Sequence, residues 1–110
     1  MSKYRSRKAT ADGITFDSKR ERDRYLELKL LEKAGVITDL VLQPRYVIHN
    51  AYVRCDGKKV REIQYIPDFR YFDTEINEEV IEDVKGVKTE VYRIKKKLFE
   101  KRYGVKITEV

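Results

Sequence analysis

The residues that decide the fold are 63–85, which read IQYIPDFRYFDTEINEEVIEDVK. Residues 63–73 alternate in a way that is typical of a β-strand with two different faces. One face would carry Ile63, Tyr65, Pro67, Phe69 and Tyr71, and the other Gln64, Ile66, Asp68, Arg70 and Phe72. The acidic residues 74–79 predict a turn, and Val80 to Lys85 predict a second short strand that Gly86 closes. We therefore expect two neighbouring strands, each with a carboxylate in an apolar setting.

Helices are expected over residues 18–34 and 89–102. Each begins at a side chain suited to capping and ends before a glycine: Ser18 and Gly35 in the first, Thr89 and Gly104 in the second. A strand bent at Pro44 is expected over residues 38–49, a hairpin around Asp56-Gly57 and a last strand over 105–110. This order predicts an α+β or α/β fold, a mixed sheet flanked by helices, in one domain over residues 16–110. Residues 1–15 are expected to form a flexible basic arm.

The charge pattern indicates a polyanionic partner. The 110 residues carry a net charge of +6, with 25 Lys and Arg against 19 Asp and Glu. Both ends are basic and the middle is acidic, so a surface built from the two ends would suit DNA, RNA or an anionic membrane face. No apolar run reaches the roughly 18 residues that span a bilayer. The single cysteine, Cys55, excludes an internal disulfide and suits a reducing cytoplasm.

The reactive residue types point to carboxylate and lysine chemistry. There is one histidine, His49, which we expect to be structural, and there is no CxxC, GxGxxG or GxxxxGK[ST] motif. Carboxylates that hold Mg²⁺, together with an ammonium group, suffice for phosphodiester hydrolysis. An acid-x-Lys tripeptide alone carries little information, because four occur: Asp17-Ser18-Lys19, Glu27-Leu28-Lys29, Asp56-Gly57-Lys58 and Asp83-Val84-Lys85. Only the last lies in an apolar strand, beside the strand that carries Asp68.

At these residues the sequence resembles the PD-(D/E)xK nuclease superfamily, with Pro67-Asp68 and Asp83-Val84-Lys85 as its signature. The resemblance covers about residues 17–110 and implies a restriction-endonuclease-like αβββαβ core. Phe16 to Leu31, Tyr65 to Tyr71 and Ile81 to Gly86 look like a small phage and prophage family of nuclease-like proteins. In size and element order the chain is also similar to Holliday-junction resolvases of the archaeal type.

The resemblance implies a set of site residues. Asp68 and Asp83 would bind the metal, helped by the carbonyl of Val84, and Lys85 would be the catalytic lysine. Glu21 would complete the metal shell or act through water. It also belongs to a capping box with Ser18, and this structural role alone would explain a glutamate at this position. Either Glu82 or Asp83 could occupy the site, and the spacing to Lys85 favours Asp83. A further polar residue from the second helix is left open among Lys88, Tyr92, Lys95 and Lys96.

The expected function is that of a Mg²⁺-dependent endodeoxyribonuclease, with Mn²⁺ able to substitute. A chain this short favours recognition of DNA shape, such as branches or Holliday junctions, and junction cutting would require a homodimer. We expect a phage or prophage protein in the cytoplasm of a bacterial host. DNA contacts are expected from Lys3, Arg5, Arg7, Lys8, Lys88, Lys95 and Lys96. The alternatives are a non-catalytic nucleic-acid-binding module of the same fold, or the nuclease subunit of a larger phage DNA-processing complex.

Overall fold

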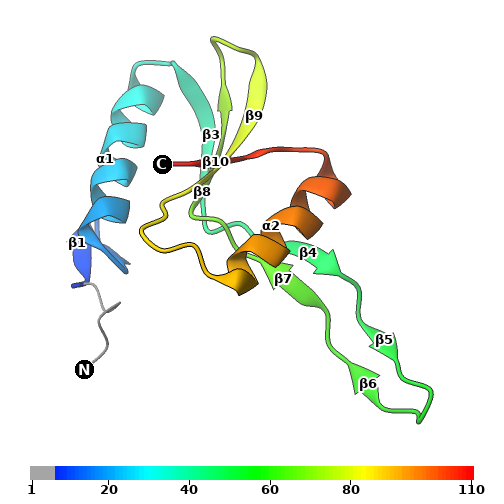
Figure 1. Ribbon diagram of the computed structural model, residues 1–110. Coiled ribbons are helices and arrows are strands. Elements are labelled where there is room, and N and C mark those ends of the chain that lie inside the picture. The colour runs from blue at the N-terminus through cyan, green and yellow to red at the C-terminus, as the bar shows by residue number, and fades with distance from the viewer. Residues whose placement is uncertain (1–6) are drawn as a thin grey trace.

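The structure is a computed structural model and describes residues 7–110. Within these residues, two helices and ten strands follow one another (Figure 1). The helices are α1 (Lys19–Lys33) and α2 (Glu90–Tyr103). The strands are β1 (Ala9–Ala11), β2 (Ile14–Phe16), β3 (Ile37–Leu42), β4 (Tyr46–His49), β5 (Tyr52–Val53), β6 (Lys59–Val60), β7 (Ile63–Tyr65), β8 (Phe69–Asp73), β9 (Glu78–Asp83) and β10 (Ile107–Glu109).

A four-stranded mixed sheet is the centre of the molecule. Its strand order is β10-β9-β8-β3, and β3, β8 and β9 are antiparallel neighbours. β10 pairs with β9 in parallel, which becomes possible because α2 carries the chain back across the sheet. With the two helices, this mixed sheet confirms the expected α+β fold, and α1, β3, β8, β9, α2 and β10 follow one another in αβββαβ order.

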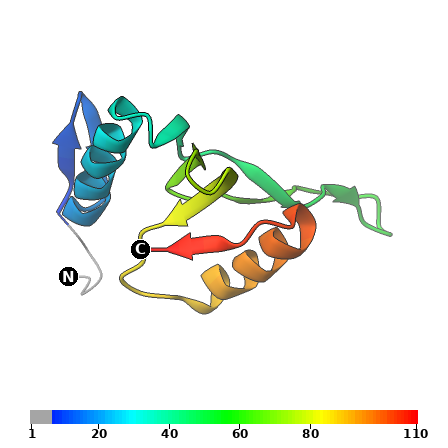
Figure 2. The ribbon, with the colours of Figure 1, turned by 90° about the horizontal axis from the view of Figure 1, so that it is seen from above.

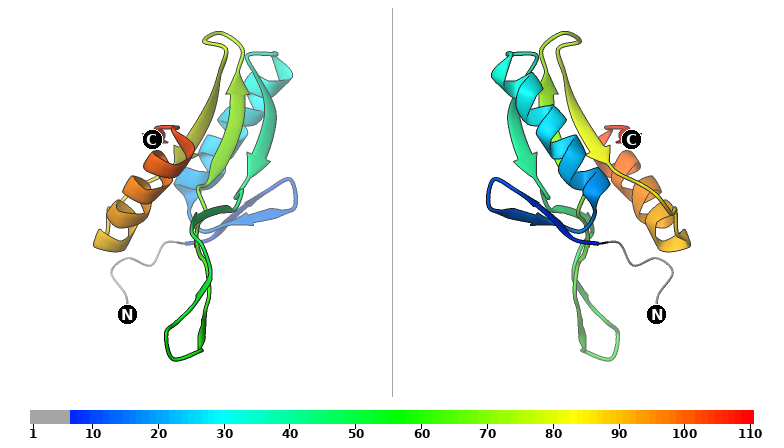
Figure 3. Two further views of the ribbon diagram at one scale, coloured as in Figure 1. Left: turned by 90° about the vertical axis from the view of Figure 1, so that its right-hand side faces the viewer. Right: turned by 90° about the vertical axis from the view of Figure 1, so that its left-hand side faces the viewer.

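The two helices cover opposite faces of the sheet (Figures 2 and 3). On the α1 side, the buried core is made of Phe16, Tyr25, Leu28, Ile37, Phe69 and Tyr71. On the α2 side, it is made of Ile48, Tyr65, Ile81, Tyr92, Phe99 and Ile107. Within residues 7–110, neither helix is long and apolar enough to cross a membrane.

The helix ends follow the capping signals. The Oγ of Ser18 accepts a hydrogen bond from the backbone N–H of Glu21 at 3.2 Å, and Thr89 does the same for Tyr92 at 3.1 Å. Both contacts satisfy N–H groups that a helix leaves without partners in its first turn. Gly104 ends α2 in the left-handed region, at φ 68°, which costs glycine little because it has no Cβ.

The prediction of a single strand over residues 63–73 is wrong, because this segment forms two strands, β7 and β8. It breaks at Ile66-Pro67-Asp68, where proline offers no N–H to a sheet ladder. β7 pairs with β4, whereas β8 pairs with β3 and β9. The expected shared face fails as well: Tyr65 packs on the α2 side, whereas Phe69 and Tyr71 pack on the α1 side. The break therefore changes the face that the chain presents.

A similar division occurs at Pro44. The strand expected over residues 38–49 is β3 followed by β4, and these two strands belong to different sheets. The hairpin expected at Asp56-Gly57 is present as β5 and β6, with Gly57 at φ 85°.

The flexible arm was expected over residues 1–15; residues 1–6 lie outside the described residues, and residues 9–15 differ from the expectation. β1 and β2 form an antiparallel hairpin over residues 9–16, with Asp12 and Gly13 at its turn, both at positive φ. The hairpin packs on α1, where Phe16 stacks near Tyr25 at 5.1 Å between ring centroids. The Tyr25 hydroxyl donates a hydrogen bond to Asp12 at 2.8 Å. Strands of three residues are too short to show alternation, so the sequence pattern did not predict this hairpin.

Candidate active site

Two adjacent acids, Glu82 and Asp83, end β9, and both are almost completely buried. Neighbouring residues of a strand point to opposite faces, so the two carboxylates have different surroundings. Glu82 faces α1, where Arg24 donates to it from Nε at 2.8 Å and from Nη2 at 2.6 Å. The Tyr71 hydroxyl also donates to Glu82. Glu82 is thus fully engaged in an internal ion pair.

Asp83 points the other way and has different partners. The hydroxyl of Tyr65 donates a hydrogen bond to its Oδ2. The ammonium Nζ of Lys85 lies 3.3 Å from its Oδ1, as expected for residues two apart on one side of an extended chain. Burial and the Asp83 hydrogen bond both raise the pKa of the Tyr65 hydroxyl, so this group stays a donor. The geometry therefore favours Asp83 over Glu82 as the acid beside Lys85.

Asp68 lies in the break between β7 and β8, and its carboxylate reaches the end of β9. Its Oδ2 accepts a hydrogen bond from the Val84 backbone N–H at 2.7 Å, and its own N–H donates to the carbonyl of Glu82 at 3.1 Å. Burial, together with hydrogen bonding and repulsion from Asp83, raises the pKa of Asp68 to about 8. Two carboxyl groups therefore share one largely buried place.

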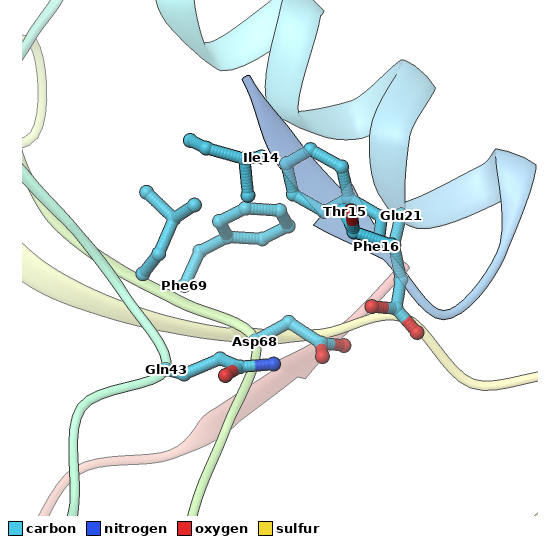
Figure 4. Close-up of a pocket in the computed structure, with 8 residues that line it drawn as sticks. Ile14, Thr15, Phe16, Glu21, Gln43, Asp68 and Phe69 are labelled. Carbon is cyan, nitrogen blue, oxygen red and sulfur yellow. The ribbon is translucent and has the colours of Figure 1, made fainter. Parts of the chain in front are cut away.

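Glu21 approaches this place from the first turn of α1. Burial raises its pKa, as do the charges of Asp17 and Asp83, while the ammonium of Lys85 lowers it. Figure 4 shows the carboxylates of Glu21 and Asp68 directed to the same side of a small pocket. Glu21 thus combines its place in the helix cap with proximity to the other acids.

Gln43 also lies next to the acids, although the sequence analysis did not identify it as a site residue. It lines the same pocket, beside Asp68 in Figure 4, and its backbone N–H donates to the carbonyl of Asp68 at 2.9 Å. Its backbone adopts φ 49°, at the end of β3. A glutamine before a proline is an ordinary loop residue, so only the fold indicates a role for it.

Lys85 is held from a second side by α2. Its Nζ lies 4.3 Å from the centroid of the Tyr92 ring, a cation–π distance. The Tyr92 hydroxyl donates to Glu109 at 2.7 Å. The ammonium is therefore placed between a carboxylate and an aromatic ring, with Tyr92 fixed in turn by β10.

The four residues that the sequence left open at or near the second helix have different contacts. Lys88 and Lys96 pair with Glu109, at 3.1 and 3.4 Å. Lys95 donates to the carbonyl of Gln64 at 3.1 Å. Of the four candidates, Tyr92 is the one that contacts Lys85 within the described residues. Lys88 and Lys96 line one surface pocket together with Tyr92.

The structure describes two of the four N-terminal residues that were expected to contact DNA. Lys3 and Arg5 lie outside the described residues. Arg7 is exposed, and Lys8 is exposed with its Nζ 3.7 Å from Asp17.

Comparison with known proteins places the chain in a family. A family model described as a protein of unknown function, DUF1064, matches residues 1–110. The chain belongs to the DUF1064 family. No curated protein and no solved structure matched it.

The donor atoms of this DUF1064 chain suit a hard divalent cation. Asp68, Asp83 and Glu21 offer only oxygen ligands, which Mg²⁺ prefers. Burial first, and then the neighbouring Asp83, raise the pKa of Asp68, as expected for two carboxyl groups that share a place poor in solvent. Within residues 7–110, however, no three acidic, histidine or cysteine side chains already stand in coordinating geometry. Asp68 accepts a hydrogen bond from the N–H of Val84, the residue after Asp83, and Glu21 lines the same pocket as Asp68, so these three side chains are the candidate ligands.

Proposed function

We propose that the chain is a metal-dependent endodeoxyribonuclease. The observation that carries the proposal is the gathering of Asp68, Asp83, Lys85 and Glu21 at one end of the sheet, from three separate parts of the chain. The αβββαβ order and the resemblance of these residues to the PD-(D/E)xK superfamily support it, as does the net charge of +6. The proposed activity comprises binding of a divalent metal ion and cleavage of DNA.

Asp68 and Asp83, with the backbone carbonyl of Val84, would hold Mg²⁺ or Mn²⁺. Such an ion offsets charge on the phosphate and makes a bound water more acidic. Glu21 would complete the metal shell or act through water, because it lines the same pocket as Asp68. Tyr65 orients Asp83 by donating to Oδ2, which leaves Oδ1 on the side of Lys85.

Lys85 would orient the attacking water and offset negative charge that develops on the phosphate. Its ammonium is held by Asp83 and by the Tyr92 ring, so it is already positioned before substrate arrives. Tyr92 is a positioning residue in this account. Selectivity for branched DNA, a homodimer for junction cutting and a phage origin are finer parts of the proposal.

Removal of Asp83 or Lys85 should separate cleavage from binding. We expect Asp83→Ala and Lys85→Ala to lower the cleavage rate by about 10²–10⁴-fold, the usual contribution of a positioned acid–base group. Affinity for DNA should persist, because neither side chain is exposed: Asp83 is buried and Lys85 is partly buried. The assay uses linear, flapped, four-way and single-stranded DNA with Mg²⁺ or Mn²⁺, and binding is measured in EDTA.

The chain contains a matched control for this experiment. Glu27 and Lys29 form the same acid-x-Lys spacing on the exposed side of α1, so Glu27→Ala and Lys29→Ala should leave cleavage unchanged. Absence of cleavage by the wild type on every substrate, with either metal, would overturn the enzyme proposal.

A non-catalytic nucleic-acid-binding module is the second candidate. It is favoured by the observation that Asp68 and Asp83 each already have a hydrogen-bond donor. Calorimetric titration with Mg²⁺ distinguishes the two candidates: a nuclease should bind the ion through Asp68 and lose this binding in Asp68→Asn, whereas the module should bind none there.

A further inference from the structure

A two-stranded arm projects from the body of the molecule (Figures 1 and 3). We define the β arm as residues 50–62, which comprise β5, β6 and the loop between them. β5 and β6 pair only with each other, and every residue of the arm is exposed except Val60. The radius of gyration is 16.2 Å, against about 13 Å for a compact domain of this length. The β arm thus buries little and contributes little to the core.

The root of the β arm is nevertheless braced against α2. Tyr46, in β4, packs on Phe99 and Tyr103 with ring centroids 5.0 and 5.2 Å apart. The Tyr103 hydroxyl donates to the carbonyl of Val47 at 2.8 Å, and Arg102 donates to the side chain of Asn50 at 2.9 Å. These contacts set the direction of the β arm relative to the sheet.

The β arm carries free positive charge. Its basic residues are Arg54, Lys58, Lys59 and Arg61, against the acids Asp56 and Glu62. Arg54 pairs with Asp56 at 3.3 Å, and Glu62 accepts a hydrogen bond from Gln64 at 2.7 Å. Within residues 7–110, Lys58, Lys59 and Arg61 form no ion pair at all, so they are available to a partner.

The charges lie on both faces of the ribbon. Lys59 is paired with Val53 and Val60 with Tyr52, and residues opposite each other share a face. Lys58 precedes β6, but its carbonyl accepts a hydrogen bond from the N–H of Arg54 at 2.8 Å, which extends the pairing by one residue and places Lys58 and Lys59 on opposite faces. The exposed apolar side chains Tyr52 and Val53 are likewise on opposite faces, so they form no single patch for a protein partner. Positive charge on both sides suits a partner that surrounds the ribbon with anions.

We propose that the β arm enters a groove of double-helical DNA and contacts phosphates on both of its walls. The major groove is about 12 Å wide and 8.5 Å deep, and it admits a two-stranded ribbon. About six residues on each side, at about 3.3 Å per residue, give a reach of about 20 Å, which exceeds the depth of the groove. This inference rests on the proposed function and specifies duplex DNA as the substrate class.

The β arm also connects directly to the candidate active site. β7 leads from it into Pro67 and Asp68, and the hydroxyl of Tyr65, the last residue of β7, donates to Asp83. A duplex held by the β arm is therefore held by the same strand that positions the acids. The β arm would set which phosphate reaches Asp68 and Asp83.

The test measures binding in EDTA, where no metal-dependent cleavage occurs. Lys58→Ala/Lys59→Ala should weaken binding of a 20-base-pair duplex roughly 10-fold at low salt. It should also reduce the slope of log K against log salt by about 2, because each phosphate contact contributes about 0.9. The matched control is Lys33→Ala/Lys106→Ala, which removes two exposed lysines near the β8–β9 turn, at the opposite end of the sheet. It should leave both quantities unchanged.

The single cysteine supplies a second measurement. Cys55 is exposed in the β arm, so duplex DNA should slow its alkylation by iodoacetamide several-fold, and slow it less in the lysine variant. Equal duplex affinity of the variant and the wild type, or no binding by the wild type, would overturn the inference. So would a variant that changes only the sedimenting mass, since the β arm would then join two copies of the chain.

Failure of the proposed function gives a different result. If the wild type binds duplex through the β arm but never cuts it, the β arm inference stands and the nuclease proposal fails. If the wild type cuts DNA and the lysine variant binds as tightly as before, the nuclease proposal stands and the β arm inference fails.

Discussion

At the scale of single residues, the charge balance around Asp68 dominates the candidate site. Its carboxyl is largely buried, it lies beside Asp83, and its pKa is raised to about 8 by burial first and by Asp83 second. Lys85, the nearby ammonium, already pairs with Asp83 at 3.3 Å. A deprotonated Asp68 is therefore poorly compensated by the protein, and its state should affect stability.

The pH dependence of stability should reveal this group. An unfolded aspartate titrates near 3.9, so a folded pKa of about 8 makes folding take up a proton between these values. The contribution of Asp68 to stability is complete below about pH 4 and is lost as pH rises through about 8. Asp68→Asn should therefore flatten the fall in Tm between about pH 4 and 8, measured by thermal denaturation. Asp23→Asn, on the exposed side of α1, should follow the wild type, and a parallel Asp68→Asn profile would contradict this account.

At the scale of elements, a buried ion pair joins α1 to the central sheet. Arg24 of α1 binds Glu82 of β9 through two nitrogens, and Tyr71 of β8 donates to the same carboxylate. The side chain of Glu82 is 1% exposed, whereas that of Arg24 is 24% exposed. Removing the partner of a buried charge is costly, because the remaining charge is left without solvent or counterion.

Arg24→Met should consequently destabilise the protein by about 3 kcal/mol, near the lower end of the range for a broken buried pair, since Arg24 is partly exposed. Urea denaturation measures the change. The double variant Arg24→Met/Glu82→Met should recover much of the loss, because it leaves no unpaired buried charge. Arg22→Met, which removes an exposed pair with Asp23, should cost roughly 0.5 kcal/mol or less. A double variant less stable than Arg24→Met would argue against this explanation.

At the scale of the whole molecule, the chain consists of a body, which is the central sheet with its two helices and two cores, and an exposed β arm. The two cores lie on the two faces of the sheet, and the β arm contributes none of their buried residues. Exposed segments outside a core have small effects on stability. The β arm should thus be removable without unfolding the body.

Replacing residues 51–61 with a two-residue Asn-Gly turn tests this separation. Such a turn suits an antiparallel pair, and β4 and β7 would remain joined. We expect the free energy of unfolding to change by less than about 1 kcal/mol, as measured by urea denaturation, while circular dichroism keeps its α+β form. Loss of cooperative unfolding would show that the β arm supports the body after all.

Much of the fold could be predicted from local signals, because caps and turns depend on neighbouring residues. The start of α1 at Ser18 and the end of α2 at Gly104 are examples. The predictions were wrong where the structure of a segment depends on contacts with residues far away in the chain. Residues 9–16 form a hairpin because they pack on α1, and residues 63–73 divide because β7 and β8 pair with different strands.

The amino-acid sequence by itself determined the α+β class, the positions of both helices and the presence of acids within apolar strands. It did so because periodicity, capping and turn chemistry act over a few residues. The spacing also favoured Asp83 as the acid beside Lys85. Only the tertiary structure decided that Glu82 pairs with Arg24 and that Tyr92 contacts Lys85. Those choices depend on which strands and helices pack together, and contacts between residues far apart in the chain leave no periodic signal in it.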